Sequence, residues 1–415
     1  LSRLDRRDMM KFEPMHKIYY KQPDEWQRIL DNRRNSESSI SLPIPIHEYN
    51  RRNTYGAFFM YHPVLVMLLL SLEEKRSAFI TLVSEVPTVL ISHVMNAFLS
   101  TEIKATNDIE GVYSSRREIQ EAIQNRENDK LRFSRIISKY KAILENPHGF
   151  TFESSPHIRA LFEDIISSEI DDKNQPDGDI FRRDSVDIVN HQGKVIHRGT
   201  LPESRIIQEM DQALAVLNDE MLVLPIRVAL FHYYFGYIHP FYDGNGRTNR
   251  FISTAYLAKY FHPLVALRLS AVINNNKKEY YDAFKMTTAE INGGDVTYFI
   301  IAFMSLIEKT IDNATELLNK RINRLFEEKQ KLEQFFKANE ITDPLLREIY
   351  ILLLQARLFS LGVGISKAEI MNACGKSRGT IFTRFKQIPK DYLIKVKYGR
   401  TESYMLKTSI LDSKE

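Results

Sequence analysis

The sequence predicts a mainly α-helical protein with a β-hairpin in its middle and a small mixed unit at its C-terminal end. Apolar residues recur at the four-residue spacing of a helix, as Leu90, Val94 and Phe98 do, in segments that open at a proline. Residues 175–199 differ, because β-branched residues stand on both sides of a turn. After about residue 345, short helical segments precede two β-prone runs around a glycine.

Composition is that of an ordinary globular protein. The 415 residues suggest one to three domains, and 43% hydrophobic and 27% charged residues are average proportions. A net charge of +4 is too small to indicate a nucleic-acid binder by itself. The single cysteine, Cys374, excludes an internal disulfide and a cysteine zinc cluster, and it suits a reducing cytosol.

No membrane segment is expected. The most apolar run, residues 57–72, is interrupted by His62 and Pro63 and is shorter than the roughly 20 residues that a spanning helix needs. The N-terminus carries Arg3, Arg6 and Arg7 without an early apolar stretch, so it does not resemble a signal peptide. These features predict a cytoplasmic protein.

The first 125 residues are predicted to form a helical region. Residues up to about 50 are expected to be irregular, with a short helix near Trp26. One helix should begin at Pro63 and another at Pro87, the latter ending at Gly111 as a C′ residue. Further helices are expected at residues 116–125 and 131–144.

The hairpin is predicted from Val186, Ile188 and Val189 before a turn at 190–193, and from Val195 and Ile196 after it. A plain surface hairpin is an equally good interpretation. Helices should then open at Pro202 and Pro225, and helices are expected at 278–286, 296–311 and 316–337. The last is charge-dense and suggests a rigid connector.

Residues 239–250 read His-Pro-Phe-Tyr-Asp-Gly-Asn-Gly-Arg-Thr-Asn-Arg and lie between two apolar helical runs. Asp243 to Gly246 is too rich in turn formers for the interior of a helix or strand. A glycine loop that opens onto a helix N-terminus gathers backbone N–H groups, and the dipole adds about half a positive charge, so the site suits phosphate. Arg247 and Arg250 lie three apart and can both reach that anion.

Two more residues of this stretch have expected roles. Asp243 is the lone carboxylate of the loop, placed to hold a divalent cation against phosphate oxygens. His239 precedes the loop, and an imidazole near its usual pKa of about 6.5 suits a base that takes a proton from a hydroxyl. Each residue alone is more often an ordinary turn, surface or core residue, but the ordered combination indicates phosphate chemistry.

The C-terminal unit, residues 341–415, has helices predicted at 345–359, 366–373 and 378–388, the second opened by a capping box at Ser366. Two β-prone runs, 392–397 and 403–406, flank Gly399. Helix–turn–helix plus a hairpin resembles a winged helix. Weak DNA binding is one interpretation of its basic face, and a solvated wing or a protein-docking module is an equal alternative. The basic residues are Lys376, Arg378, Arg384, Lys386, Lys390, Lys395, Lys397 and Arg400.

The stretch from His239 to Arg250 matches every fixed position of the Fic family signature, His-Pro-Phe-x-(Asp/Glu)-Gly-Asn-Gly-Arg-x-x-Arg. The resemblance covers roughly residues 87–307, and Gly294 to Thr297 and Tyr280-Tyr281 also resemble the family's pattern. It implies a Fic helical core at 126–311, followed by a helical connector at 312–340 and the winged-helix unit.

The resemblance implies a protein adenylyltransferase that moves AMP from ATP to a Ser, Thr or Tyr hydroxyl of a target protein. His239 would be the general base and Asp243 would bind Mg²⁺. Nucleotide phosphates would meet Gly244, Asn245, Gly246, Arg247 and Arg250, and Phe241 would anchor the loop in the core. Tyr280 or Tyr281 would line the adenine pocket, although packing is an equal alternative. The flap that aligns the target by strand addition would include Val195, Ile196, His197 and Arg198.

Thr106, Glu110 and Gly111 resemble the family's inhibitory motif, (Ser/Thr)-x-x-x-Glu-(Gly/Asn). The resemblance implies that Glu110 pairs with Arg250, which should hold the γ-phosphate, and so misaligns bound ATP. Because the motif lies in the same chain, the protein would be self-inhibited, and self-modification is expected.

Other functions remain open at this level. The same site can serve AMP removal, with Glu110 aligning water, or the transfer of another phosphate-containing group such as phosphocholine. A DNA-binding regulator with a Fic-type sensor core is an alternative from another class. A homodimer is also considered, and the sequence leaves the target protein open.

Overall fold

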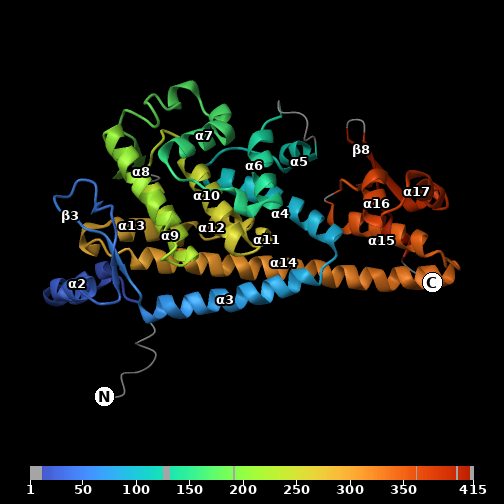
Figure 1. Cartoon of the computed structure of the whole chain (residues 1–415), viewed down its shortest axis with the longest axis horizontal. Helices are drawn as coiled ribbons and strands as arrows, with labels where there is room; N and C mark the ends of the chain where they lie inside the picture. Colours follow the sequence, from blue (N-terminus) through green and yellow to red (C-terminus); the bar gives the residue numbers. More distant parts are fainter. Residues whose placement is uncertain (1–11, 125–130, 190–191, 361, 399–400, 412–415) are drawn as a thin grey trace, which may run out of the picture.

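The computed structural model describes residues 12–124, 131–189, 192–360, 362–398 and 401–411, and it confirms a mainly helical fold (Figure 1). Among these residues, no helix combines the length and apolar surface that crossing a membrane requires. The α-helices are α1 (Met15–Lys21), α2 (Trp26–Arg34), α3 (Pro63–Ser84), α4 (Thr88–Ile109), α5 (Arg116–Gln124), α6 (Ser134–Glu145), α7 (Ser155–Ile165), α8 (Glu203–Asn218), α9 (Leu224–Ile238), α10 (Asn245–Tyr260), α11 (Pro263–Ala266), α12 (Leu269–Asn275), α13 (Lys277–Thr288), α14 (Thr297–Ala338), α15 (Pro344–Phe359), α16 (Lys367–Cys374) and α17 (Arg378–Phe385).

The strands are short and form four small sheets. They are β1 (Ser39–Ser41), β2 (Ile46–His47), β3 (Thr54–Tyr55), β4 (Phe58–Met60), β5 (Asp187–Val189), β6 (Val195–Arg198), β7 (Ile365–Ser366), β8 (Leu393–Tyr398) and β9 (Thr401–Leu406). Antiparallel pairs join β1 to β4, β2 to β3 and β5 to β6, and the fourth sheet has the order β7-β9-β8.

The first 50 residues are more ordered than the sequence predicts. Residues 1–11, with Arg3, Arg6 and Arg7, lie outside the described residues, but α1, β1 and β2 occupy part of the segment expected to be irregular. The pairing partners of these strands lie further along the chain, as Ile40 opposite Phe59 shows. Strands of two or three residues carry almost no periodic signal, so only the folded chain reveals them.

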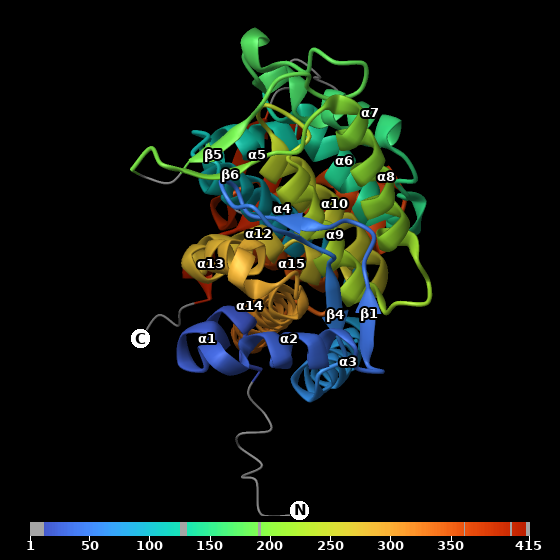
Figure 2. The same cartoon turned by 90° about the vertical axis from the view of Figure 1, so that its left-hand side faces the viewer.

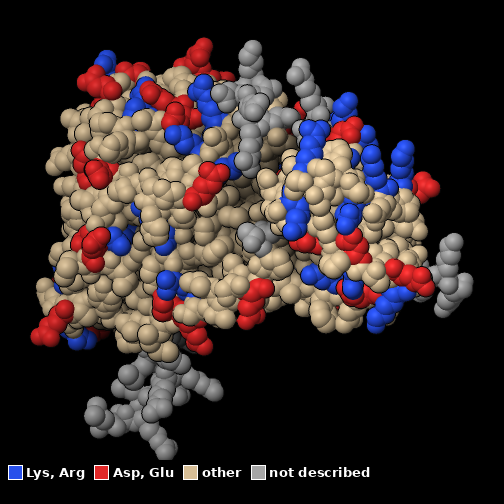
Figure 3. All heavy atoms as spheres, turned by 45° about the vertical axis from the view of Figure 1, so that its right-hand side comes forward, with Lys and Arg blue, Asp and Glu red and all other residues tan. Residues whose placement is uncertain are grey.

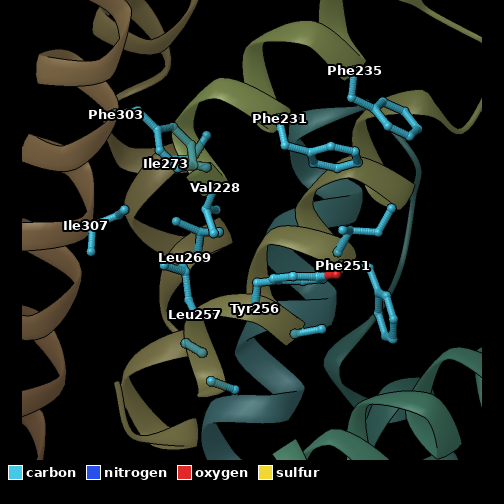
Figure 4. Packing of buried hydrophobic residues seen from close by; sticks show 14 of the residues in the cluster. Val228, Phe231, Phe235, Phe251, Tyr256, Leu257, Leu269, Ile273, Phe303 and Ile307 are labelled. Atoms are coloured by element: carbon cyan, nitrogen blue, oxygen red, sulfur yellow. The ribbon is translucent and has the colours of Figure 1, made fainter. Parts of the chain in front are cut away.

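Two helices lie at the centre of the fold. Almost every residue of α9 is buried, and α10 is buried along most of its length. A helix that is apolar on all sides has to be surrounded by other elements. Figure 4 shows side chains of α9, α10, α12 and α14 meeting, among them Phe231, Leu257 and Phe303. This packing fixes the loop between α9 and α10, residues 239–244.

The predicted starts and ends of the surrounding helices are largely confirmed. Pro63 opens α3, and Pro87 directly precedes α4. Gly111 follows the C-cap of α4 with a positive φ of 71°, which a glycine adopts without strain. The helix α5 ends at Gln124, and Asn125 lies outside the described residues.

The longest helix changes the expected organisation of the C-terminal half. The two helices predicted at 296–311 and 316–337 are one continuous helix, α14, of 42 residues. No helix breaker stands between them, since residues 312–315 read Asp-Asn-Ala-Thr. Figure 1 shows α14 along most of the length of the molecule with α3 beside it, and Figure 2 views both helices end on.

A second hydrophobic cluster forms around α15, α16, α17 and the three-stranded sheet. The capping box at Ser366 is present, whereas α17 ends at Phe385, three residues earlier than predicted. The turn residues Gly399 and Arg400 lie outside the described residues. The order helix, strand, helix, helix, strand, strand is observed in this unit.

Candidate active site

The loop from His239 to Gly244 is fixed by its two ends. His239 ends α9 in a left-handed conformation with φ 53°, and Gly244 precedes α10 with φ 81°. A Cβ atom at Gly244 would lie 2.5 Å from the Ile166 Cγ2 atom. Both the positive φ and this close approach therefore require a glycine at 244.

Two side chains hold the loop between these ends. The Asn245 side chain accepts from the Phe241 N–H at 2.9 Å and donates to the Phe241 carbonyl at 2.7 Å. The Phe241 ring is buried and stacks on Phe162 with 4.0 Å between ring centroids, as expected for a core anchor. The Asn245 side chain is therefore engaged with the backbone of Phe241.

The first turn of α10 therefore begins earlier than the sequence indicates. Asn245 and Gly246 were expected in a turn, but both are helical, because the loop needs only Gly244 to change direction. Backbone N–H groups of a helical first turn have no partner within the helix, so they are available to an anion.

An anionic group of the chain itself lies against this turn. A Cβ atom at Gly246 would lie 2.0 Å from Glu110 Oε1 and 2.9 Å from Arg250 Nη1. Glu110 is the C-cap residue of α4, so the end of the helix that carries Thr106 meets the start of α10. Only a glycine at 246 leaves room for this carboxylate.

Arg250 is the centre of the contact between α4 and α10. Its Nη2 donates to Glu110 Oε1 at 2.7 Å, and its Nε donates to Thr106 Oγ1 at 2.8 Å. The Arg250 side chain is 1% exposed, whereas the Glu110 side chain is 28% exposed. The structure thus brings Thr106, Glu110 and Arg250 together as the inhibitory motif implies, with the carboxylate at the open end.

Arg247 has a carboxylate partner that the sequence did not suggest. Its Nη1 donates to Glu169 Oε2 at 3.2 Å, and both side chains are buried. Burial raises the pKa of Glu169, and the Arg247 charge opposes that effect. Glu169 belongs to no motif and comes close only through folding, so no sequence signal could have identified it.

His239 is half-buried at the mouth of the loop, next to the hairpin. Its Nδ1 lies 3.3 Å from the Gly236 carbonyl, and only a protonated Nδ1 can donate to a carbonyl. The tautomer therefore leaves Nε2 as the proton acceptor. The expected pKa near 6.5 is wrong, because burial and the neighbouring His197 lower the pKa of His239 to about 4.

Hydrogen bonds to backbone carbonyls connect the hairpin and the residues beside it to the loop and the end of α9. Buried Arg182 donates from Nε to the His239 carbonyl at 2.9 Å and from Nη2 to the Thr200 carbonyl at 2.9 Å. His197 Nε2 donates to the Tyr237 carbonyl at 2.6 Å. Arg182 was not singled out from the sequence, since a lone arginine before a predicted hairpin carries no signal.

The outer side of the hairpin is exposed. Val195 and His197 are partly buried and alternate with Ile196 and Arg198, which face solvent. Ile196 and Val189 are 45% and 54% exposed. Asn190 and His191 lie outside the described residues. Figure 2 shows β5 and β6 standing out beside the helices.

Asp243 fits the site of a magnesium ion that arrives with a nucleotide. Its carboxylate is half-buried and accepts from the Gly244 N–H through Oδ1. In the described part of the chain, no group of three or more His, Cys, Asp or Glu residues could hold a metal by itself. Magnesium often takes one or two carboxylates, with phosphate and water as its other ligands, so one carboxylate suffices.

Tyr280 and Tyr281 differ in their exposure to solvent. Tyr280 is buried, and its hydroxyl donates to His232 Nε2 at 2.8 Å, since His232 Nδ1 donates to Ser253. Tyr281 is 49% exposed, and its ring contacts that of Tyr280. The structure therefore places only Tyr281 on the surface, where a nucleotide base could reach it.

A protein-family model described as the Fic/DOC family matches residues 154–257, which include α7 to α9, the whole loop and α10 as far as Leu257. This segment of the chain therefore resembles the Fic/DOC family. The match covers the hairpin, His239, Asp243 and both arginines, while α4 with Glu110 lies before it.

Curated relatives of the Fic domain are protein adenylyltransferases by name. The chain is 33% identical over 112 residues to "Protein adenylyltransferase Fic" of Nematostella vectensis, which is 25% of this chain and 24% of that protein. It is 29% identical over 136 residues to the Drosophila melanogaster protein of the same name, which is 33% of this chain and 25% of that one. The chain thus spans about a quarter of the length of the curated relatives it matches.

Solved structures similar to the chain include a Fic family protein from Desulfovibrio desulfuricans. It is 19% identical, with a TM-score of 0.49, and the match covers 83% of this chain and 96% of that one.

Proposed function

We propose that this chain is a protein adenylyltransferase that transfers AMP from ATP to a Ser, Thr or Tyr hydroxyl, and that Glu110 restrains it. One observation carries the proposal: the N-terminus of α10 already holds an anion, the Glu110 carboxylate, against Gly246 and Arg250. A buried guanidinium beside the N-terminus of a helix, which here pairs with a carboxylate, also suits phosphate.

The roles in transfer follow from the geometry. The target hydroxyl oxygen attacks the α-phosphorus, and the bond from that phosphorus to the oxygen bridging to the β-phosphate breaks, releasing pyrophosphate. His239 Nε2 accepts the hydroxyl proton, and a lowered pKa keeps it unprotonated at neutral pH. Bound Mg²⁺ would neutralise phosphate charge, with Asp243 holding it. The Val195–Arg198 strand would align the target segment.

Restraint by Glu110 follows from the shared use of Arg250. The guanidinium that would hold the γ-phosphate is occupied by Glu110 and Thr106. ATP can then enter only with its terminal phosphate displaced, so the α-phosphorus is misaligned. This arrangement supports a self-inhibited transferase.

Mass spectrometry of the full-length Glu110→Gly protein with ATP and Mg²⁺ tests the proposal. A mass gain of one AMP group on a Ser, Thr or Tyr residue is expected, and Glu110→Gly combined with His239→Ala should show none. Transfer of a terminal phosphate, or no mass gain on the protein or on added cell extract, would contradict the adenylyl-transfer assignment. Loss of AMP from a pre-modified target would instead support removal.

A further inference from the structure

Positive charge is concentrated in the C-terminal unit. Residues 341–415 hold 13 Lys and Arg against 7 Asp and Glu, whereas residues 1–340 hold 44 against 46. The small net charge of the chain therefore conceals a basic unit attached to a slightly acidic one. Figure 3 shows Lys and Arg side chains gathered on the part of the molecule that holds this unit. Such asymmetry indicates an anionic macromolecular partner.

Some of these basic side chains have internal roles. Arg384 Nε donates to Asp343 Oδ2 at 2.6 Å, and Asp343 caps α15, so Arg384 holds α17 against α15. Lys395 pairs with Glu402 across the β8–β9 hairpin at 2.6 Å. Lys367 lies over aromatic rings of the C-terminal core. Arg384, which the sequence placed in the basic face, is therefore unavailable to a ligand.

Five other residues of the predicted basic face are exposed, and no ion pair within the described residues includes them. They are Lys376, Arg378, Lys386, Lys390 and Lys397.

These side chains lie on one helix, the turns at its ends and one strand. In α17, Ile381 and Phe385 face the C-terminal core, whereas Arg378 at the start of the helix and Lys386 just after its end are exposed on the outer side. The Arg378 guanidinium lies 5.2 Å from the centre of the Phe382 ring. A Cβ atom at Gly379 would meet nothing within 4 Å, so this outer side is open. No acidic residue occurs in α17.

We propose that this surface, formed by α17, its flanking turns and β8, binds the backbone of duplex DNA. The helix α17 follows the short helix α16 and precedes a hairpin, as in a winged helix, where the second helix of the pair enters the major groove. A groove about 12 Å wide admits a helix about 10–12 Å across. Lysines of the turns and of β8 would then contact phosphates beside it.

The surface lacks what a protein partner would need. Interfaces between proteins are anchored by large apolar or aromatic side chains. In the described part of residues 341–411, none of the large apolar side chains is exposed. Phosphate contact by unpaired lysines and an arginine is therefore favoured over docking of a protein segment.

Titration of the full chain with a fluorescent duplex of about 25 base pairs and mixed sequence tests the proposal. Five phosphate contacts predict a slope of log affinity against log salt near −4.5, from about 0.9 per contact. The triple variant Arg378→Gln, Lys386→Gln, Lys397→Gln should flatten the slope by about 2.7. It should also weaken binding at least about tenfold at low salt. The matched control replaces Lys17, Lys173 and Lys320, all exposed and outside this unit, with Gln.

Each outcome of this comparison either supports or overturns the proposal that this surface binds duplex DNA. Binding by the wild type and the control, with loss in the triple variant, supports a DNA-binding surface. Absence of binding near 50 mM salt, or equal loss in the control, overturns it. Equal affinity for heparin or polyglutamate would also overturn it, because the surface would then select charge and not a duplex. A Tm of the triple variant equal to that of the wild type shows that folding is preserved.

Discussion

Replacement of Glu110 by glycine should convert a weakly active protein into an active one. The pair joins a guanidinium that is 1% exposed to a carboxylate that is 28% exposed, at 2.7 Å. Two unit charges about 4 Å apart attract by about 4 kcal/mol at an effective dielectric constant near 20. Because Glu110 is partly hydrated and Arg250 keeps two hydrogen bonds to Thr106, we expect about 2 kcal/mol from the contact.

This magnitude sets the expected gain in rate. A γ-phosphate can take the position on Arg250 only after Glu110 leaves it. Removing a competitor worth about 2 kcal/mol should raise the productive population of bound ATP, and hence self-modification, by about 30-fold. Glu110→Gln, which keeps the shape but loses the charge, should lie between the wild type and Glu110→Gly.

The assay measures incorporation of label from α-labelled ATP together with the free energy of unfolding. Glu110→Gly and Arg250→Ala break the same ion pair, so both should lose stability, but only Glu110→Gly should gain activity. Asp312→Asn is the matched control, since it breaks a 2.7 Å pair with Lys75 between α3 and α14. The reasoning is refuted if Glu110→Gly is no more active than the wild type.

Four further predictions concern the loop between α9 and α10 and the helix α4. His239→Ala should abolish transfer with nucleotide affinity nearly unchanged, because its proposed role is to accept the proton of the target hydroxyl; an equal loss of ATP affinity in calorimetry would make it a binding residue. In Glu110→Gly, the pH at the midpoint of the acid limb of the pH–rate profile should lie well below the ordinary histidine pKa of about 6.5, since the pKa of His239 is about 4. Asp243→Ala should remove Mg²⁺-dependent activity, and unchanged metal dependence would place the cation elsewhere. Burial raises the pKa of Glu102, on α4, to about 7, against the hydrogen bonds from Ser270. The folded protein therefore holds an extra proton between pH 4.5 and 7, and stability falls as pH rises through that range. The free energy of unfolding of Glu102→Gln, measured in denaturant melts, should rise relative to that of the wild type by up to about 3 kcal/mol from pH 4.5 to above 7. Parallel curves of unfolding free energy against pH for the two proteins would contradict this.

The sequence predicted those parts of the fold that proline, glycine and helical spacing mark. Pro63, Pro87 and Gly111 set helix ends where expected, because fixed φ and positive φ are properties of single residues. The hairpin was predicted by its β-branched residues and is confirmed by the antiparallel pairing of β5 with β6, in which Ile188 lies opposite His197. The short helix α12 was missed, since seven residues hold too few turns to show a period.

The residue types of the candidate site were predictable from the sequence, but the contacts between them and their pKa shifts were not. The sequence contains Arg247 and Glu169 without any sign that they meet, since 78 residues separate them. The depressed pKa of His239 depends on burial and on His197, which lies in the hairpin. Contacts across the fold, and the pKa shifts that follow from them, require the packed chain.

The continuity of α14 has a consequence for how the protein unfolds. One face of this helix contributes Leu318 and Leu325 to the large cluster, and two turns further on Leu332 and Phe336 enter the small one. Melting the second half of the helix would strip both clusters of side chains at once. The parts of the chain around the two clusters should therefore unfold in a single cooperative transition. If the chain were cut at residue 311, neither of the two fragments would keep its fold intact.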